Sequence, residues 1–171
     1  MHNVDVAALE TTINQARSDP SAAVQRVSFD GEWSTASGPQ FTATIPVPNG
    51  GSFTFEADFP PPMGGTGSAP NPLAYCFWGG LACYAMTFAQ ESALRGVELR
   101  GLRAHAAAEV DMTRALGLSD NPPVRSIDWT LDVDADADAT TLDAIKAATD
   151  EHCPGVYCLR NPIELHTQLG A

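Results

Sequence analysis

The sequence predicts an α+β protein with mainly antiparallel sheet and one long buried helix. Strand-like and helix-like segments follow one another in blocks, without the β–α–β alternation that builds a parallel sheet. A single apolar segment in the middle of the chain has clear helix boundaries at both ends. The composition, 44% apolar and 18% charged in 171 residues, suits one globular domain over residues 1–171 with a sizeable core.

A short helix and a meander are predicted first. Apolar residues recur at near-helical spacing within residues 5–18 and stop before Pro20, which indicates an amphipathic helix within 1–20 that packs on the core. Three runs rich in β-branched and aromatic residues then predict antiparallel strands: 23–33, 40–47 and 52–59. The last two strands are joined by a Pro-Asn-Gly-Gly turn at 48–51.

The long helix is predicted from its boundaries. Residues 60–72 are dense in proline and glycine, so they form a loop that leads into it. Asn71 suits the N-cap, Pro72 the first helical position and Gly96 the C-terminal stop. The body, 73–94, is apolar on nearly every side for most of its length, which predicts a helix buried over most of its surface.

The remaining segments predict a second hairpin, a helix and a last strand. Residues 97–113 and 124–136 read as paired strands. Residues 140–152 read as a helix that ends before Pro154, because the residue ahead of a proline disfavours helical geometry. The inward-facing residues of this helix are predicted to be Leu142, Ile145 and Ala148. Residues 162–169 are predicted to close the sheet as a strand.

Charge and hydropathy narrow the classes of partner. Nine Lys and Arg against 21 Asp and Glu give a formal charge of −12, which repels phosphate backbones and anionic lipid. No apolar run reaches the roughly 18 residues of a membrane span, and the N-terminus lacks the pattern of a secretory signal. We therefore expect neither a nucleic-acid nor a membrane partner, and a cytoplasmic location.

The four cysteines are too few for a disulfide scaffold, so they are free, redox-active or metal-binding thiols. Cys76 and Cys83 lie seven residues apart on one helix, about 10 Å along its axis, and cannot bridge each other. Cys153 precedes Pro154 in an N-cap-like position, where unpaired N–H groups and the helix dipole favour a thiolate. That position suits an inert buried thiol equally well.

Two motifs resemble the OsmC/Ohr family of thiol-dependent peroxidases: PNPLAYCFWGGLACYAMT at 70–87 and EHCPGVYCLRNPI at 151–163. In that family the reactive cysteine stands eleven residues after the proline of an Asn-Pro helix start, which is Cys83 here. The second cysteine belongs to a Cys-Pro motif, which is Cys153 here. The resemblance implies an intertwined homodimer, with sheets from both subunits wrapped around two central helices.

The resemblance also implies a reaction that needs no cofactor. The Cys83 thiolate would attack an organic hydroperoxide to give a sulfenic acid, Cys153 would capture it as a disulfide, and a dithiol reductant would restore both thiols. An apolar pocket would favour organic peroxides, and its candidate lining residues are Phe77, Trp78, Tyr84 and Phe88. Aromatic residues on such a helix are more often only part of the core.

The chain departs from the family pattern at the groups that activate the thiol. Leu73 stands where the peroxidases have a glutamate, and WSTASGPQF (33–41) lacks their arginine. Arg26 is a possible substitute. Cys76 and Cys158 are additional thiols. These departures keep open a non-catalytic dimer of the same fold that binds a small apolar ligand or acts as a redox switch.

Metal sites are the weaker alternatives. His152, Cys153 and Cys158, with Cys83 or Cys76, lack the close ligand pairs that zinc prefers. The aspartates of 132–143 resemble a calcium loop, but Ala137 replaces the glycine of its turn and Asp143 its bidentate glutamate. We predict a solvated strand end that leads to a helix N-cap instead. The lone histidines, His105 and His166, read as structural.

Overall fold

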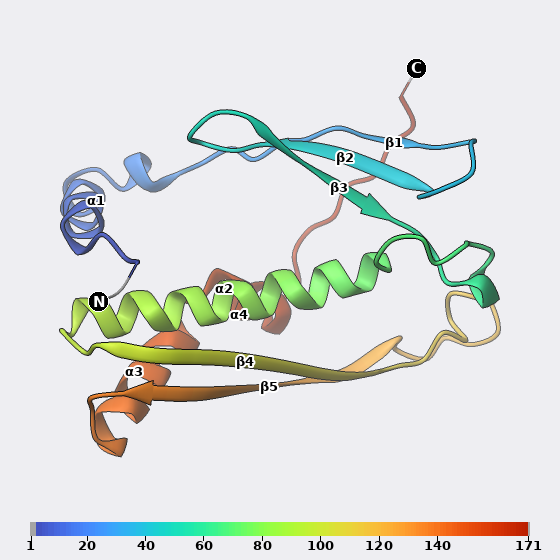
Figure 1. The fold of residues 1–171 in the computed structure, drawn as a ribbon. Helices are drawn as coiled ribbons and strands as arrows, with labels where there is room; N and C mark the ends of the chain where they lie inside the picture. The colour runs from blue at the N-terminus through green and yellow to red at the C-terminus, as the bar shows by residue number, and fades with distance from the viewer. Residues whose placement is uncertain (1–2, 171) are drawn as a thin grey trace. The chain divides into compact units, whose positions relative to one another are not determined.

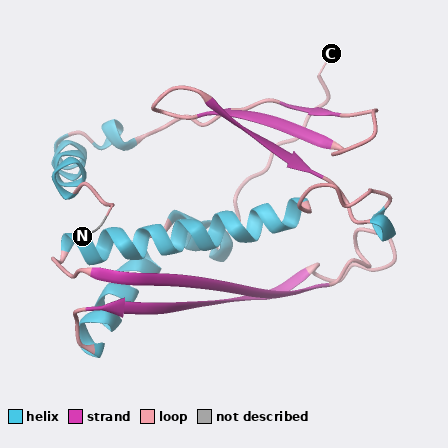
Figure 2. Ribbon diagram, in the orientation of Figure 1, coloured by secondary structure: helices cyan, strands magenta, loops and turns pink. Residues whose placement is uncertain are grey.

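The computed structural model describes residues 3–170, which form two compact units: residues 9–77, and residues 78–170 together with 3–8 (Figures 1 and 2). The two units are described separately below. The helices and strands in chain order are α1 (Val6–Ser18), β1 (Gly31–Trp33), β2 (Phe41–Pro46), β3 (Ser52–Ala57), α2 (Pro72–Leu94), β4 (Leu99–Val110), β5 (Val124–Ala135), α3 (Ala139–His152) and α4 (Pro154–Arg160). Two short 3₁₀ helices, η1 (Pro20–Ala23) and η2 (Pro61–Met63), lie in the loops.

The unit 9–77 contains the predicted antiparallel meander, with strand order β1-β2-β3. Strands β2 and β3 pair along their whole length, from Phe41↔Ala57 to Pro46↔Ser52. The prediction of a first strand over 23–33 was wrong for residues 23–30, since β1 contains only Gly31–Trp33. A strand forms only where a neighbouring backbone completes its hydrogen bonds, and β2 pairs with these three residues alone.

Helix α1 is amphipathic as predicted, but it does not pack in a core. Its predicted apolar stripe is half-buried, while the rest of the helix is exposed. None of its residues is buried, so the prediction of a core-packing helix was wrong. The stripe consists of Val6, Leu9, Ile13 and Ala16.

Helix α2 begins and ends at the predicted residues. The Asn71 side chain accepts a hydrogen bond from the Leu73 N–H at 2.9 Å, and Pro72 is the first helical residue. At the other end Gly96 has a φ of +69°, and the Val97 N–H donates to the Ser92 carbonyl at 2.9 Å. This is the Schellman geometry for which glycine is favoured.

Burial of α2 is limited to its second half, which corrects the prediction of a mostly buried helix. Its buried residues start at Tyr84, whereas Trp78 in the first half is 60% exposed; within the second half Met86 is still 66% exposed. An all-apolar helix needs cover on every side, but β4, β5, α3 and α4 pack against the part of α2 around Tyr84 and Phe88. Phe88 and Ile145 are the centre of this core.

Strands β4 and β5 form the predicted second hairpin, and α2 and α3 pack on it (Figure 1). Helix α3 starts at the Asp138 N-cap, whose carboxylate accepts a hydrogen bond from the Thr141 N–H at 2.8 Å. The strand end and N-cap predicted for the aspartate-rich segment are therefore confirmed. Of the predicted inward-facing residues Ile145 is fully buried, and Leu142 and Ala148 are half-buried.

The C-terminal segment does not form the predicted strand. After α3 the chain enters α4, and residues 162–170 have no regular structure. The Ile163 and Leu165 side chains are 63% and 84% exposed. No strand of the described chain pairs with residues 162–169, and a strand needs a partner backbone to complete its hydrogen bonds. Among residues 3–170 no helix is long and apolar enough to cross a membrane.

Candidate active site

The structure brings together two of the four cysteines. Cys83 lies on α2 and Cys153 at the junction of α3 and α4, and their Sγ atoms are 3.5 Å apart. Both are free thiols. The Cys153 side chain is 1% exposed, whereas Cys83 is half-buried. A small molecule therefore has better access to Cys83.

Backbone geometry places Cys153 in this position. Cys153 caps the end of α3, where its N–H donates to the Thr149 carbonyl at 3.0 Å. It is also the N-cap of α4, with Pro154 at the first helical position, as the sequence predicted. The Tyr157 N–H donates to the Cys153 carbonyl at 3.0 Å and starts the new helix. The Cys-Pro pair thus turns the chain over the α2 thiol.

Gly155 allows the close approach of α4 to α2. A Cβ atom at this position would lie 3.2 Å from Cys83 Cβ and 3.4 Å from the Gly80 carbonyl oxygen. These distances are tighter than most real Cβ contacts. A glycine after Cys-Pro was the one signal in the sequence that could have revealed this contact.

The electrostatic environment of Cys83 disfavours the thiolate. Burial raises the pKa of the Cys83 thiol above its ordinary value, and the neighbouring Cys153 thiol adds to the rise. The hydrogen bond from the Gly155 N–H acts in the opposite direction but does not outweigh burial. In the family pattern an arginine held by a glutamate supports the thiolate, and Leu73, at the glutamate position, cannot hold one.

Tyr84 connects the site to α3. Its hydroxyl donates to Asp150 Oδ1 at 2.7 Å, and Lys146 Nζ donates to Asp150 Oδ2 at 2.7 Å. Burial, together with the bond to Asp150, raises the pKa of Tyr84 far above its ordinary value. Burial opposes ionisation of Asp150, but the bonds from Lys146 and Tyr84 outweigh it and lower the pKa of this carboxyl. Tyr84 is therefore a neutral donor to a charged carboxylate.

A groove of about 530 Å³ lies beside the thiol pair. Tyr84 and Val156, which line it, also pack against Cys153. The other apolar residues that line it are Val124, Ile127, Trp129 and Leu159, and the charged ones are Arg125, Lys146, Asp150 and Arg160. Within the described chain the buried Trp129 indole N–H has no hydrogen-bond partner. A ligand with an acceptor atom could satisfy it.

The remaining predicted residues lie in different environments. Phe88 belongs to the core and lines a second hollow of about 280 Å³ with Tyr84. Trp78 is exposed and Phe77 half-buried, and neither lines a groove described here. The additional thiols, Cys76 and Cys158, are exposed. Across residues 3–170 no group of three or more His, Cys, Asp or Glu side chains could hold a metal ion.

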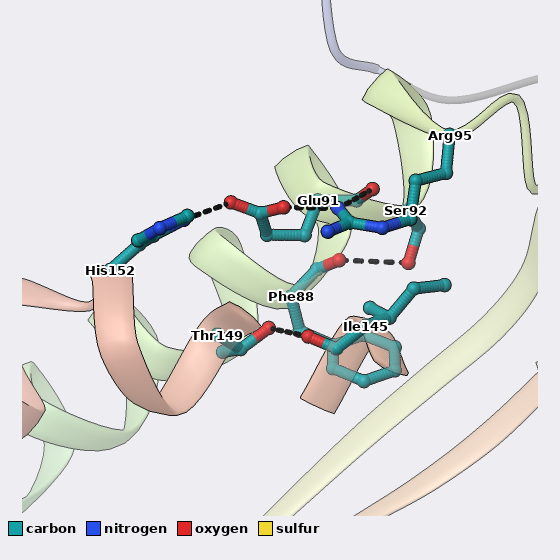
Figure 3. A network of polar contacts seen from close by, with 7 residues as sticks. All are labelled: Phe88, Glu91, Ser92, Arg95, Ile145, Thr149 and His152. Carbon is teal, nitrogen blue, oxygen red and sulfur yellow. Dashed lines mark hydrogen bonds and ion pairs between the residues drawn. The ribbon is translucent and has the colours of Figure 1, made fainter. Parts of the chain in front are cut away.

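A second ionic cluster, which the sequence did not reveal, joins Glu91, Arg95 and His152 (Figure 3), and His152 directly precedes Cys153 in the sequence. Glu91 of α2 contacts two residues: His152 Nδ1, at 2.7 Å from Glu91 Oε1, and the Arg95 guanidinium. Burial opposes ionisation of Glu91, but the hydrogen bonds from His152 and Arg95 outweigh it and lower its pKa. No short motif links residues 61 positions apart, so nothing in the sequence indicated this pair.

Comparisons with solved structures show the fold. An OsmC-like protein from Mycoplasma pneumoniae aligns with a TM-score of 0.58 at 16% identity, over 80% of this chain and 88% of that one. An organic hydroperoxide resistance protein OsmC from Legionella pneumophila aligns with a TM-score of 0.53 at 14% identity, over 80% and 92%. A protein from Psychrobacter arcticus described as a putative osmotic stress induced and detoxification response protein has a TM-score of 0.57 at 12% identity, over 79% and 90%.

A search of curated proteins gave no match. The family model for OsmC-like proteins matches residues 65–168, which is more than half of the chain and includes both Cys83 and Cys153. The α+β architecture with antiparallel sheets agrees with this match. The chain therefore belongs to the family of OsmC-like proteins.

Proposed function

We propose that this protein is a thiol-dependent peroxidase that reduces organic hydroperoxides. The observation that carries the proposal is the 3.5 Å separation of the Cys83 and Cys153 sulfurs, from segments 70 residues apart. The family membership supports the same role, and so does the name of the Legionella pneumophila neighbour.

The accessible thiol would be the attacking one. The Cys83 thiolate attacks the distal peroxide oxygen, the O–O bond breaks, and the alcohol leaves after protonation, so that Cys83 becomes a sulfenic acid. The Cys153 thiol then attacks the Cys83 sulfur, and water leaves as the disulfide forms. A dithiol of the cell would reduce this disulfide and release two protein thiols. Cys153, which is nearly inaccessible, suits the second role.

An intertwined homodimer in the cytoplasm remains part of the proposal. Exposed apolar side chains support a partner subunit, since exposed apolar surface marks interaction sites; among them are Trp33, Phe53, Trp78 and Met86. Arg26, in an irregular segment before β1, remains a candidate for the missing arginine.

Peroxide titration of the reduced protein tests the function. We expect cumene hydroperoxide to remove two thiols and to give a Cys83–Cys153 linkage in peptide mapping by mass spectrometry. Cys153→Ser should accumulate a sulfenic acid on Cys83, and Cys83→Ser should not react. Cys158→Ser, which removes an exposed thiol, is the matched control and should behave like the wild type.

The pH dependence of the first step is a second readout. Because the pKa of Cys83 is raised, its thiolate fraction and reaction rate should still increase at pH values above about 8.5, where an ordinary thiol is already half ionised. Thiols that stay reduced in excess organic hydroperoxide at every pH would contradict the proposal.

A second candidate function is the binding of a small apolar ligand in the groove. The unpartnered Trp129 N–H and the disfavoured Cys83 thiolate are the observations in its favour. Titration with decanol should then change the tryptophan fluorescence of the wild type but not of Trp129→Phe. The absence of a change in both proteins would leave this candidate without support.

A further inference from the structure

Glu91 is a buried carboxylate that connects α2 to the last turn of α3. The residue is 8% exposed, and His152 and Arg95 contact its two carboxylate oxygens (Figure 3). An ionised carboxylate can only accept hydrogen bonds, so the His152 Nδ1–H group donates a hydrogen bond to Glu91 Oε1. His152 is the direct sequence neighbour of Cys153.

The contact acts on the residue that must reach Cys83. The C-terminal turn of α3 is held on α2 at two places, by Asp150 to Tyr84 and by His152 to Glu91. Cys153 follows directly and is 3.5 Å from Cys83, while a disulfide needs an S–S distance of about 2.05 Å. A small displacement of this turn therefore changes how often the two sulfurs meet.

The burial of Glu91 indicates a role in positioning rather than in stability. A buried ion pair contributes little net stability, because desolvation of the charges offsets their attraction. It does favour one packing arrangement over others in some proteins. His152 and Arg95 have side chains that are 57% and 37% exposed, so water can solvate both if Glu91 loses its charge.

We propose that Glu91 is a positioning residue that holds Cys153 against Cys83 through His152. The proposal rests on the use of this thiol pair in the proposed function. Loss of the Glu91–His152 contact lowers the effective concentration of the Cys153 thiol at Cys83, while the protein stays folded. The two thiols then form their disulfide less readily with any oxidant.

A glutathione equilibrium measures this concentration without any peroxide. Two protein thiols and oxidised glutathione exchange into a protein disulfide and two reduced glutathione molecules. A displacement of about 1 Å can lower reactivity about a hundredfold. Because Gln at position 91 keeps one hydrogen-bond acceptor, we expect a smaller loss, so that Glu91→Gln lowers the equilibrium constant about tenfold. For this two-electron couple tenfold corresponds to about 30 mV. Peptide mapping restricts the readout to the Cys83–Cys153 linkage.

Two further variants complete the experiment. His152→Ala removes the same contact from the exposed side and leaves Glu91 paired with Arg95, so it should lower the equilibrium constant by a similar factor. This variant keeps the test possible if Glu91→Gln fails to fold. Asp134→Asn makes the same chemical change in an exposed pair with Arg100 and should leave the constant unchanged. Urea unfolding of each reduced variant measures its free energy of unfolding. We expect this free energy to change by less than the free energy of the thiol–disulfide exchange.

The outcomes separate this inference from the proposed function. A wild-type constant in both Glu91→Gln and His152→Ala would overturn the positioning role, even if the protein reduces peroxides. A wild type that forms no Cys83–Cys153 disulfide with oxidised glutathione would overturn it as well. Lowered constants in both variants would support it, even if peroxides leave the wild-type thiols unchanged and the peroxidase proposal fails.

Discussion

The two compact units differ in what holds them together. Of the twelve buried residues within the described chain, eleven belong to residues 78–170 and one, Asp58, to residues 9–77. The unit 78–170 has two apolar clusters, one around Phe88 and Ile145 and one around Tyr84 and Cys153. The unit 9–77 has a three-stranded sheet, and none of its apolar side chains is buried.

Local interactions organise the unit 9–77 in place of a core. The Asp58 carboxylate accepts four hydrogen bonds, from the backbone N–H and hydroxyl groups of Thr66 and Ser68. The Tyr75 hydroxyl at the start of α2 donates to the Glu56 carbonyl of β3 at 2.7 Å. Its large apolar side chains stay exposed, including Trp33 at 62% and Phe53 at 61%.

This difference indicates that the meander needs residues from outside the unit 9–77 to pack against its exposed apolar side chains. A small sheet is stable only when one face is packed, and this one carries its aromatic side chains in the open. A second copy of the chain, as the proposed homodimer would supply, is a partner that fits this requirement. Substitutions in the two units can test the comparison.

The largest effect is expected in the unit that has the core. Phe88 is 2% exposed and packs against Val97 and Ile145. Phe88→Ala should lower the free energy of unfolding by about 3–5 kcal/mol, because it removes buried surface and leaves a cavity. Urea denaturation followed by circular dichroism measures this loss. A change below about 1 kcal/mol would contradict the idea that this unit carries the stability.

A smaller, pH-dependent effect is expected at Asp58. Its hydrogen bonds with Thr66 and Ser68 lower the pKa of this carboxyl to about 2. Since the folded-state pKa is lowered, the stabilisation is fully present above the unfolded value of about 3.9 and is lost as the pH falls through about 2. Asp58→Asn should lose this stabilisation at neutral pH and show a flatter acid dependence.

Limited proteolysis of the loop 60–70 between pH 2 and pH 7 can follow this effect, with an acid-stable protease and peptide mapping. The matched control is Asp138→Asn, which changes the N-cap of α3 in the other unit. Equal cleavage of the loop in Asp58→Asn and the wild type would show that other contacts hold this loop.

The smallest effect is expected on the exposed face of the meander. Phe53 is 61% exposed, so Phe53→Ala should change the unfolding free energy of the isolated chain by about 0.5 kcal/mol or less. A loss of several kcal/mol, together with a fall in mass from dimer to monomer in analytical ultracentrifugation, would show that a second subunit covers this face. The difference in burial between the units 9–77 and 78–170 would then apply only to the single chain and not to the dimer.

Elements with local boundary signals were predictable. The caps at Asn71 and Gly96 act within a few residues, and the structure has both where the sequence indicated. The N-cap expected within the aspartate-rich segment is Asp138. Strand formation at 23–30 and 162–169 was predicted wrongly, because a strand depends on a partner backbone that local patterns do not reveal. The Glu91–His152 contact had no local signal at all.

The candidate site was partly predictable, since the resemblance to the family singled out both Cys83 and Cys153. Their reactivity was not, because burial by residues far along the chain raises the pKa of Cys83. The sequence by itself determined where the helices begin and end, because those preferences are set by neighbouring residues. Only the tertiary structure decided which half of α2 is buried and how close the two sulfurs lie, because both depend on contacts between distant segments.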